Sequence, residues 1–145
     1  MNVYIIRHTA PDVPQGTCYG QTDVPLKETF KTEAQAVKDS IPDIRFDAVY
    51  TGYLGSTRQI DYVAEIMDQV GTDGCVRIVD PAMADNGNLY PGFDGAFVEA
   101  MKTLCSKADY VIPNITEACF LSEVEYRENY DENYVKKLLD KLSKL

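Results

Sequence analysis

The stretch Phe46-Asp47-Ala48-Val49-Tyr50-Thr51-Gly52-Tyr53-Leu54-Gly55-Ser56 decides the fold. Its first half, as far as Tyr50, is mostly aromatic, β-branched or small and predicts a buried strand. The two glycines then predict a turn. Ser56 is a good N-cap for a helix. The apolar residues of that helix recur at helical spacing: Ile60, Val63, Ala64 and Met67.

The same alternation continues on both sides of this stretch. Upstream, residues 3–6 predict a buried strand and residues 28–40 predict a helix, which Pro42 ends. Downstream, Gly71 and Gly74 are expected to break the chain. The later elements are expected as strands at 76–79 and 110–112 and as helices at 93–106, at 116–121 and after a cap at Asp131.

Strands that alternate with helices predict right-handed crossovers and a parallel sheet. We therefore expect an α/β fold, a three-layer Rossmann-like sandwich. Its mostly parallel sheet should have about four strands, with helices on both faces. Residues 1–145 are expected to form a single domain.

Composition and charge exclude several classes of partner. Asp and Glu number 23 against 14 Lys and Arg, a net charge of −9. This balance argues against nucleic acid or an anionic membrane as the partner. No apolar run reaches the roughly 20 residues that span a bilayer, and no signal peptide is visible. We expect a cytoplasmic protein.

The cysteines are expected to be free thiols in a reducing compartment. They are widely spaced, and with His8 as the one histidine a Cys/His zinc site is not expected. Their positions are Cys18, Cys75, Cys105 and Cys119.

Polar clusters follow each expected strand. They are residues 7–9, 52–56, 80–85 and 114–117. Because ligands bind outside the carboxyl ends of parallel strands, these clusters are expected on one rim of the sheet. In the first cluster, His8 could accept a phosphoryl group while Arg7 neutralises it. The alternative is a strand-end histidine in a polar loop, which spacing alone favours.

The first part of the chain resembles the histidine phosphatase (phosphoglycerate mutase-like) superfamily, in its α-ribazole phosphatase branch. The matching strings are Val3-Tyr4-Ile5-Ile6-Arg7-His8-Thr9 and Cys18-Tyr19-Gly20-Gln21-Thr22-Asp23-Val24-Pro25-Leu26. The resemblance covers about residues 1–51 and implies that His8 is phosphorylated and that Arg7 grips the phosphate. It then fails, because Ser56 stands where the family has a second arginine, the nearest arginine is Arg58, and the second histidine is missing.

Residues from about 46 to 145 resemble the pyridoxal (pyridoxine) kinases of the ribokinase-like superfamily. Three strings carry this resemblance, at residues 46–60, 79–90 and 108–118. It implies that Asp80, Asp85, Asn114 and Glu117 organise Mg²⁺, water and ATP phosphates. The alternative reading is that Asp80 and Asn114 only cap turns and helix starts.

Together the two resemblances suggest a chimera joined near residues 46–51, with vestigial catalytic residues Arg7 and His8. We expect no efficient catalysis and no required cofactor, with Mg²⁺ and ATP implied only by the kinase resemblance. A small phosphate-bearing ligand could bind weakly at Arg7, Thr9, Ser56 and Arg58. The alternative is a remnant phosphoryl-transfer enzyme. An incomplete sheet should also leave an open edge, so a homo-oligomer is expected.

Overall fold

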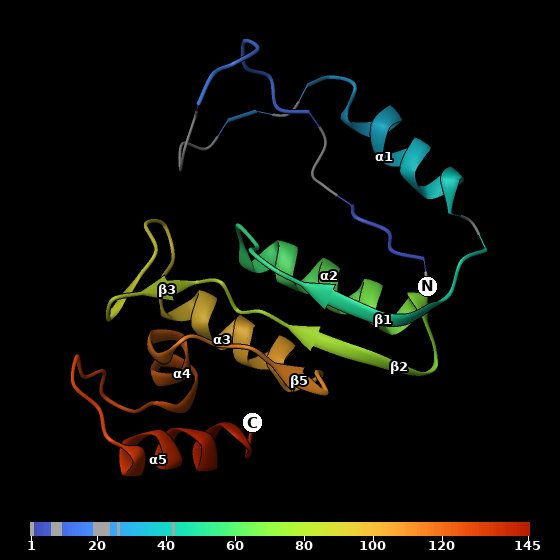
Figure 1. Ribbon diagram of the computed structural model, residues 1–145. Coiled ribbons are helices and arrows are strands. Elements are labelled where there is room, and N and C mark those ends of the chain that lie inside the picture. Colours follow the sequence, from blue (N-terminus) through green and yellow to red (C-terminus); the bar gives the residue numbers. More distant parts are fainter. Residues whose placement is uncertain (1, 7–9, 19–23, 26, 42) are drawn as a thin grey trace. The chain divides into compact units, whose positions relative to one another are not determined.

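The computed structural model describes residues 2–6, 10–18, 24–25, 27–41 and 43–145. The chain divides into two compact units, Met1–Ile44 and Arg45–Leu145. Figure 1 shows the elements of each. The division falls close to the predicted join at residues 46–51.

The first unit contains one helix among its described residues, α1 (Phe30–Ser40). Glu33 connects this helix to the preceding segment, because its carboxylate accepts hydrogen bonds from the Ala10 backbone N–H at 2.9 Å and from the Thr29 hydroxyl at 2.6 Å. These bonds, the one from Thr29 first, lower the pKa of Glu33. The predicted helix over 28–40 is confirmed apart from its first residues.

The strand predicted over residues 3–6 is wrong. Residues 3–6 have no regular secondary structure, and Val3 and Ile5 are 70% and 90% exposed. A β-branched run forms a strand only when a neighbouring strand pairs with it and a hydrophobic layer covers it. The described residues of this unit provide no such ladder.

The second unit is built on a parallel sheet of β1 (Phe46–Thr51), β2 (Gly71–Val79) and β5 (Tyr110–Val111), in the order β1-β2-β5. This confirms the α/β class and the parallel sheet, with three strands rather than about four. Thr51 is aligned with Val79, and Val79 with Val111, so the three strands end at the same rim.

β2 begins at Gly71 and is longer than the strand predicted over 76–79. The expected break is confirmed at Gly71, which is the C-cap of α2, but not at Gly74, which lies inside β2. The register between the strands shifts after Phe46, which pairs with Gly71, while Ala48 pairs with Val76. Gly74 has φ of +85°, a conformation that glycine adopts without a steric penalty, and so allows this irregularity inside a strand.

Two helices cover one face of this sheet. They are α2 (Thr57–Val70) and α3 (Gly95–Cys105), which contact each other (Figure 1). The predicted N-cap of α2 is confirmed, since the Ser56 hydroxyl accepts from the Gln59 backbone N–H at 3.3 Å. Side chains from both helices meet those of the sheet in the core, which includes Ile60, Met67, Val79, Phe97, Met101 and Leu104. The other face of the sheet carries exposed side chains, namely Tyr50, Val76, Tyr110 and Ile112.

The remaining elements lie around the carboxyl end of β2 and beyond β5. A hairpin of β3 (Ala84–Asp85) and β4 (Asn88–Leu89) follows β2. α4 (Ile115–Ser122) follows β5, and α5 (Glu132–Leu142) packs on α4. The predicted cap of α5 is confirmed, because Asp131 accepts from the Tyr134 backbone N–H at 2.8 Å. No described helix is long and apolar enough to cross a bilayer.

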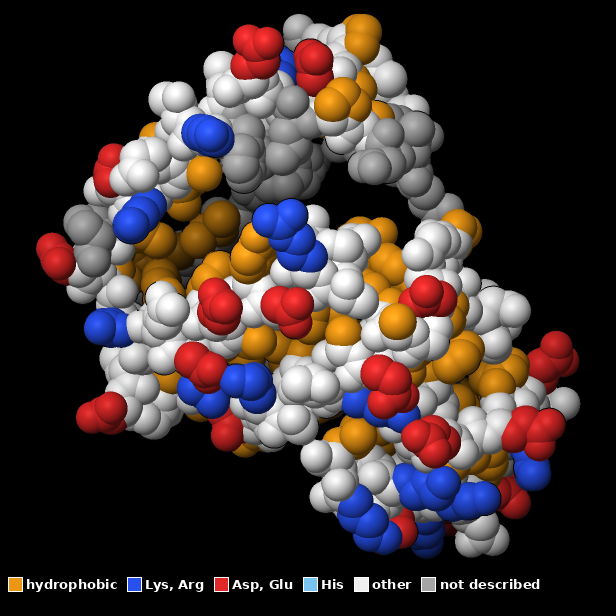
Figure 2. Space-filling model, turned by 180° about the vertical axis from the view of Figure 1, so that it is seen from behind, with side chains coloured by type: hydrophobic (Ala, Val, Ile, Leu, Met, Phe, Trp, Pro, Cys, Tyr) orange, Lys and Arg blue, Asp and Glu red, His pale blue; other side chains and the backbone are white. Residues whose placement is uncertain are grey.

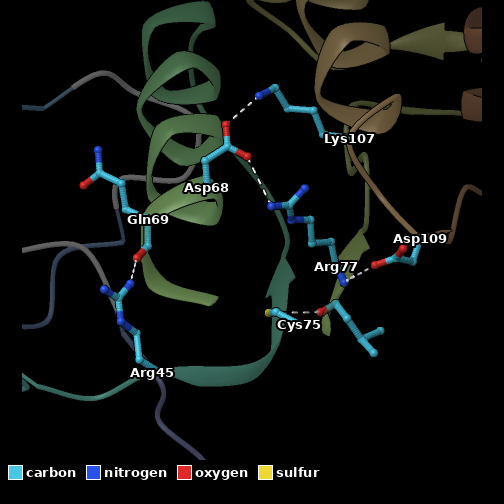
Figure 3. A network of polar contacts seen from close by, with 8 residues as sticks. Arg45, Asp68, Gln69, Cys75, Arg77, Lys107 and Asp109 are labelled. Carbon is cyan, nitrogen blue, oxygen red and sulfur yellow. Dashed lines mark hydrogen bonds and ion pairs between the residues drawn. The ribbon is translucent and has the colours of Figure 1, made fainter. Parts of the chain in front are cut away.

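A polar network joins the elements at the end of the sheet opposite the rim (Figure 3). Asp68 on α2 forms ion pairs with Arg77 on β2 at 3.3 Å and with Lys107 at 2.7 Å. Asp109 accepts from the backbone N–H of Arg77 at 2.8 Å, and Arg45 donates to the carbonyl oxygen of Gln69. This end is therefore occupied by structural contacts, whereas the rim carries the candidate site.

Candidate functional site

Glu117 is the centre of the rim. It lies in the first turn of α4 and is 2% exposed. Its Oε1 accepts hydrogen bonds from the backbone N–H of Met83 at 3.0 Å and of Ala84 at 3.5 Å, and its Oε2 accepts from that of Asn114 at 2.9 Å. A buried carboxylate is tolerated when backbone donors surround it in this way. Glu117 thus fastens the start of the hairpin to the start of α4.

Asn114 completes this arrangement from the other side. Its Oδ1 accepts from the Glu117 backbone N–H at 2.9 Å, so the two residues form a capping box. Its Nδ2 donates to the carbonyl oxygen of Ala84 at 2.8 Å. Asn114 therefore caps α4, as the alternative interpretation of this residue predicts, and it also bonds to the hairpin.

The segment held by these contacts is strained. Ala82 has φ of 38° and Asn86 has φ of 49°, both in the left-handed region that side chains disfavour. Gly87 follows with φ of 77°, and its N–H donates to the Thr116 hydroxyl at 3.0 Å. Strained backbone persists only where surrounding contacts fix it, and such positions are concentrated at functional sites.

The charges of three rim carboxylates act on Tyr90. Burial raises the pKa of Tyr90, and the negative charges of Glu117, Asp85 and Asp80 raise it further. The ring of Tyr90 lies 6.5 Å from that of Phe93, and its backbone N–H donates to the Met83 carbonyl. Besides Glu117, the other two carboxylates also accept hydrogen bonds: Asp85 accepts from the Asn86 backbone N–H at 2.9 Å, and Asp80 accepts from the Tyr50 hydroxyl at 2.8 Å.

Sequence reasoning missed Tyr50 as a partner of Asp80. The hydrogen bond to Asp80 is the first cause that raises the pKa of Tyr50, followed by burial and the charge of that carboxylate. The sequence signal is that both residues lie at the ends of expected strands; that these two strands are neighbours follows only from the sheet order and register.

The rim is anionic. No ion pair among the described residues involves Asp80, Asp85 or Glu117. The described part of the chain also contains no cluster of three or more residues suited to holding a metal ion.

The predicted phosphate site stays a prediction. Arg7, His8 and Thr9 lie outside the described residues. Ser56 caps α2. The Arg58 side chain contacts Tyr62, one turn further along the same helix. Its Nε donates to the Tyr62 hydroxyl at 2.7 Å, and its guanidinium lies 5.3 Å from the centre of the Tyr62 ring.

Comparison with known proteins supports the kinase reading. The model of the family described as phosphomethylpyrimidine kinase matches residues 15–145. The pyridoxal kinase of Dictyostelium discoideum is 29% identical over 100 residues, which are 67% of this chain and 32% of that protein. The match to the family model begins at residue 15, so it overlaps the segment that resembles histidine phosphatases. It supports neither the phosphatase part nor a join at 46–51.

Solved structures of similar fold are also described as kinases of this kind. A Bacteroides thetaiotaomicron protein described as a phosphomethylpyrimidine kinase, in a crystal form with pyridoxal, superposes with a TM-score of 0.68 and 35% identity over 78% of this chain and 39% of its own. Pyridoxal kinase from Lactobacillus plantarum gives a TM-score of 0.64 and 30% identity over 88% of this chain and 45% of its own. The chain thus spans less than half the length of these relatives.

Proposed function

Because the chain belongs to the phosphomethylpyrimidine kinase family, we propose that it supplies the phosphate-facing rim of a kinase that acts on pyridoxal or a similar hydroxymethyl-substituted aromatic ring. The relatives named above are described as kinases of this kind. We further propose that the chain by itself does not catalyse efficient phosphoryl transfer.

The observation that carries the proposal is the Glu117 clamp, by which we mean the hydrogen bonds from the Met83, Ala84 and Asn114 backbone N–H groups to the Glu117 carboxylate. It fixes the strained hairpin and the N-terminus of α4 to each other, so that Asp80, Asp85 and Tyr90 are held at one rim. Phosphoryl transfer depends mainly on positioning and electrostatic stabilisation, and both require polar groups that are fixed before the reactants arrive. A rigid polar rim at the carboxyl ends of parallel strands meets this requirement.

The charge of the rim explains why the chain alone should be slow. The transferred phosphoryl group is negative, and its transition state needs cations or N–H donors. The described rim offers carboxylates without cationic partners. Asp80 and Asp85 are the residues that would meet a divalent cation carried in with nucleotide phosphates, as such ions are bound by one or two carboxylates and by the phosphates themselves.

Nucleotide binding and turnover test the two halves of the proposal separately. We expect titration calorimetry with ADP and Mg²⁺ to give a dissociation constant of about 1 mM. The Asp80→Asn variant should abolish this binding, whereas Asp61→Asn, at an exposed position on α2, should leave it unchanged. If Asp80→Asn binds as well as the unmodified chain, the rim does not face the phosphates.

Turnover is measured as ATP-dependent phosphorylation of pyridoxal, with the Lactobacillus plantarum enzyme as the reference. Loss of a single charge-stabilising donor typically lowers rates by roughly 10²–10³-fold, so we expect at least that deficit for the chain alone. A rate close to that of the reference would contradict the second half of the proposal.

A further inference from the structure

The carboxylate oxygens of the rim differ in whether they already accept hydrogen bonds. Both oxygens of Asp85 accept from Asn86, Oδ1 from its backbone N–H at 2.9 Å and Oδ2 from its Nδ2 at 3.1 Å. Both oxygens of Glu117 accept from the backbone N–H groups of the clamp. In Asp80, Oδ2 accepts from the Tyr50 hydroxyl at 2.8 Å, whereas no described residue donates to Oδ1. Among the described residues, Oδ1 of Asp80 is thus the one oxygen of these carboxylates without a donor.

The sheet explains why Tyr50 reaches Asp80. Tyr50 on β1 is aligned with Ile78 on β2, and Asp80 follows Ile78 by two residues. Asp80 continues the ladder between these strands, since its backbone N–H donates to the Thr51 carbonyl at 3.0 Å. Alternate residues of an extended segment point to the same face of a sheet, so Tyr50 and Asp80 share a face. The hydrogen bond between them therefore follows from the sheet register, which holds the Tyr50 hydroxyl beside one oxygen of the carboxylate.

The charge of Asp80 is not balanced by an ion pair among the described residues. Two lysines of α5 and its C-terminal end pair instead with nearby acids: Lys136 with Glu132 at 2.6 Å, and Lys144 with Asp140 at 2.7 Å. Figure 2 shows Lys and Arg side chains gathered beside acidic ones at the bottom of the molecule, where α5 lies. A cation that arrives with a ligand would therefore meet Asp80 with its charge uncompensated.

We propose that Tyr50 sets the cation preference of the rim, an inference that rests on the proposed function. By holding Oδ2 of Asp80, Tyr50 leaves one carboxylate oxygen for the cation that accompanies the nucleotide phosphates, and so favours Mg²⁺ over Ca²⁺. Ca²⁺ takes more oxygen ligands than Mg²⁺ and readily accepts both oxygens of one carboxylate. Mg²⁺ demands near-octahedral geometry and keeps several waters beside one or two carboxylates and the phosphates. A carboxylate restricted to one oxygen suits Mg²⁺ and withholds a bidentate contact from Ca²⁺.

Tyr50 is a positioning residue, because it acts through Asp80. Its side chain is 59% exposed, so removal of the hydroxyl leaves no buried cavity, and exposed polar pairs contribute little to stability. A merely structural role predicts that loss of the hydroxyl weakens binding with both cations equally. The positioning role predicts a split, since Asp80 without Tyr50 can rotate away from Mg²⁺ but can offer both oxygens to Ca²⁺.

The test compares ADP binding in excess Mg²⁺ with ADP binding in excess Ca²⁺, at the same ionic strength. Affinities are taken from NMR titrations of the backbone amide signals of the full chain. The unmodified chain should bind ADP more tightly with Mg²⁺ than with Ca²⁺. In Tyr50→Phe the ratio of the two affinities should fall by about tenfold, the effect expected for one hydrogen bond to a charged group. The urea midpoint of this variant should equal that of the unmodified chain.

Tyr110→Phe is the matched control. Tyr110 on β5 is also aligned with Ile78, is 63% exposed, and has no hydrogen bond from its hydroxyl to a described residue. This variant should keep the cation preference of the unmodified chain. The proposal is overturned if Tyr50→Phe keeps that preference, if it weakens both complexes equally, or if Tyr110→Phe changes the ratio as much. Failure of the proposed function gives a different result: the unmodified chain then binds ADP with neither cation, and the role of Tyr50 is refuted with it.

Discussion

Replacement of Glu117 should destabilise the second unit more than replacement of any exposed acidic residue. The carboxylate is 2% exposed and accepts hydrogen bonds from three backbone N–H groups. Two of these bonds are short, those from Met83 at 3.0 Å and from Asn114 at 2.9 Å. Substitution leaves buried donors without partners, and such donors cost more than the bond itself contributes.

The magnitude follows from the two short bonds. A hydrogen bond to a charged group contributes about 1.5 kcal/mol or more, so Glu117→Ala should lower the free energy of unfolding by about 3 kcal/mol. Glu117→Gln keeps one acceptor oxygen but turns an NH₂ group toward a backbone donor, and we expect a loss of about 2 kcal/mol. With an m-value of about 1.5 kcal/mol/M in urea, the midpoint should fall by about 2 M for the alanine variant.

Urea unfolding followed by far-UV circular dichroism measures this loss. The chain has no tryptophan, so the backbone signal is the suitable probe. Glu65→Gln is the control, because Glu65 is exposed on α2, and its effect should stay within about 0.5 kcal/mol. If the free energy of unfolding of Glu117→Ala lies within about 0.5 kcal/mol of that of the unmodified chain, Glu117 does not hold the hairpin and α4 together.

Two further predictions concern backbone and thiol chemistry. Gly87→Ala should lower the free energy of unfolding by about 1–3 kcal/mol, because φ is +77° and the new Cβ would lie 2.7 Å from the Tyr126 ring. Gly74→Ala is the control: φ is +85° but the space around it is open, so the loss in the same urea titration should be smaller. Burial raises the pKa of Cys105 to about 12, so at about pH 8.5, where an ordinary thiol is half ionised, iodoacetamide should modify the exposed Cys18 and leave Cys105 unmodified until the chain unfolds. Equal rates at both cysteines in the folded chain would contradict this.

The features that sequence reasoning predicted correctly in this chain are local. A helix N-cap needs only a side-chain oxygen and the N–H groups of the next turn, and both lie within a few residues. The sequence therefore predicts Ser56 and Asp131 as caps, and the structure confirms both. The capping alternative for Asn114 is borne out for the same reason.

The features that sequence reasoning missed depend on residues far apart in the chain. Residues 3–6 form no strand, because a strand depends on a neighbouring strand and a covering layer that no local pattern reports. The Tyr50 hydroxyl reaches Asp80 across two strands, a separation of 30 residues, and Glu117 reaches Met83 across 34. Each contact becomes visible only when the sheet register is known, because the register decides which strand ends are neighbours.

Glu117 both stabilises the fold and positions the rim, so a Glu117 variant cannot by itself show which of the two roles matters for nucleotide binding. Loss of nucleotide binding in a Glu117 variant has two sources, the altered rim and the unfolded fraction of the chain. Asp80→Asn separates them, since Asp80 is bonded through its side chain to the exposed Tyr50 rather than to buried backbone donors. Exposed polar pairs contribute little to stability, so this variant should fold normally while it lacks one rim charge. Binding that is lost in Asp80→Asn with an unchanged urea midpoint therefore reports the rim itself.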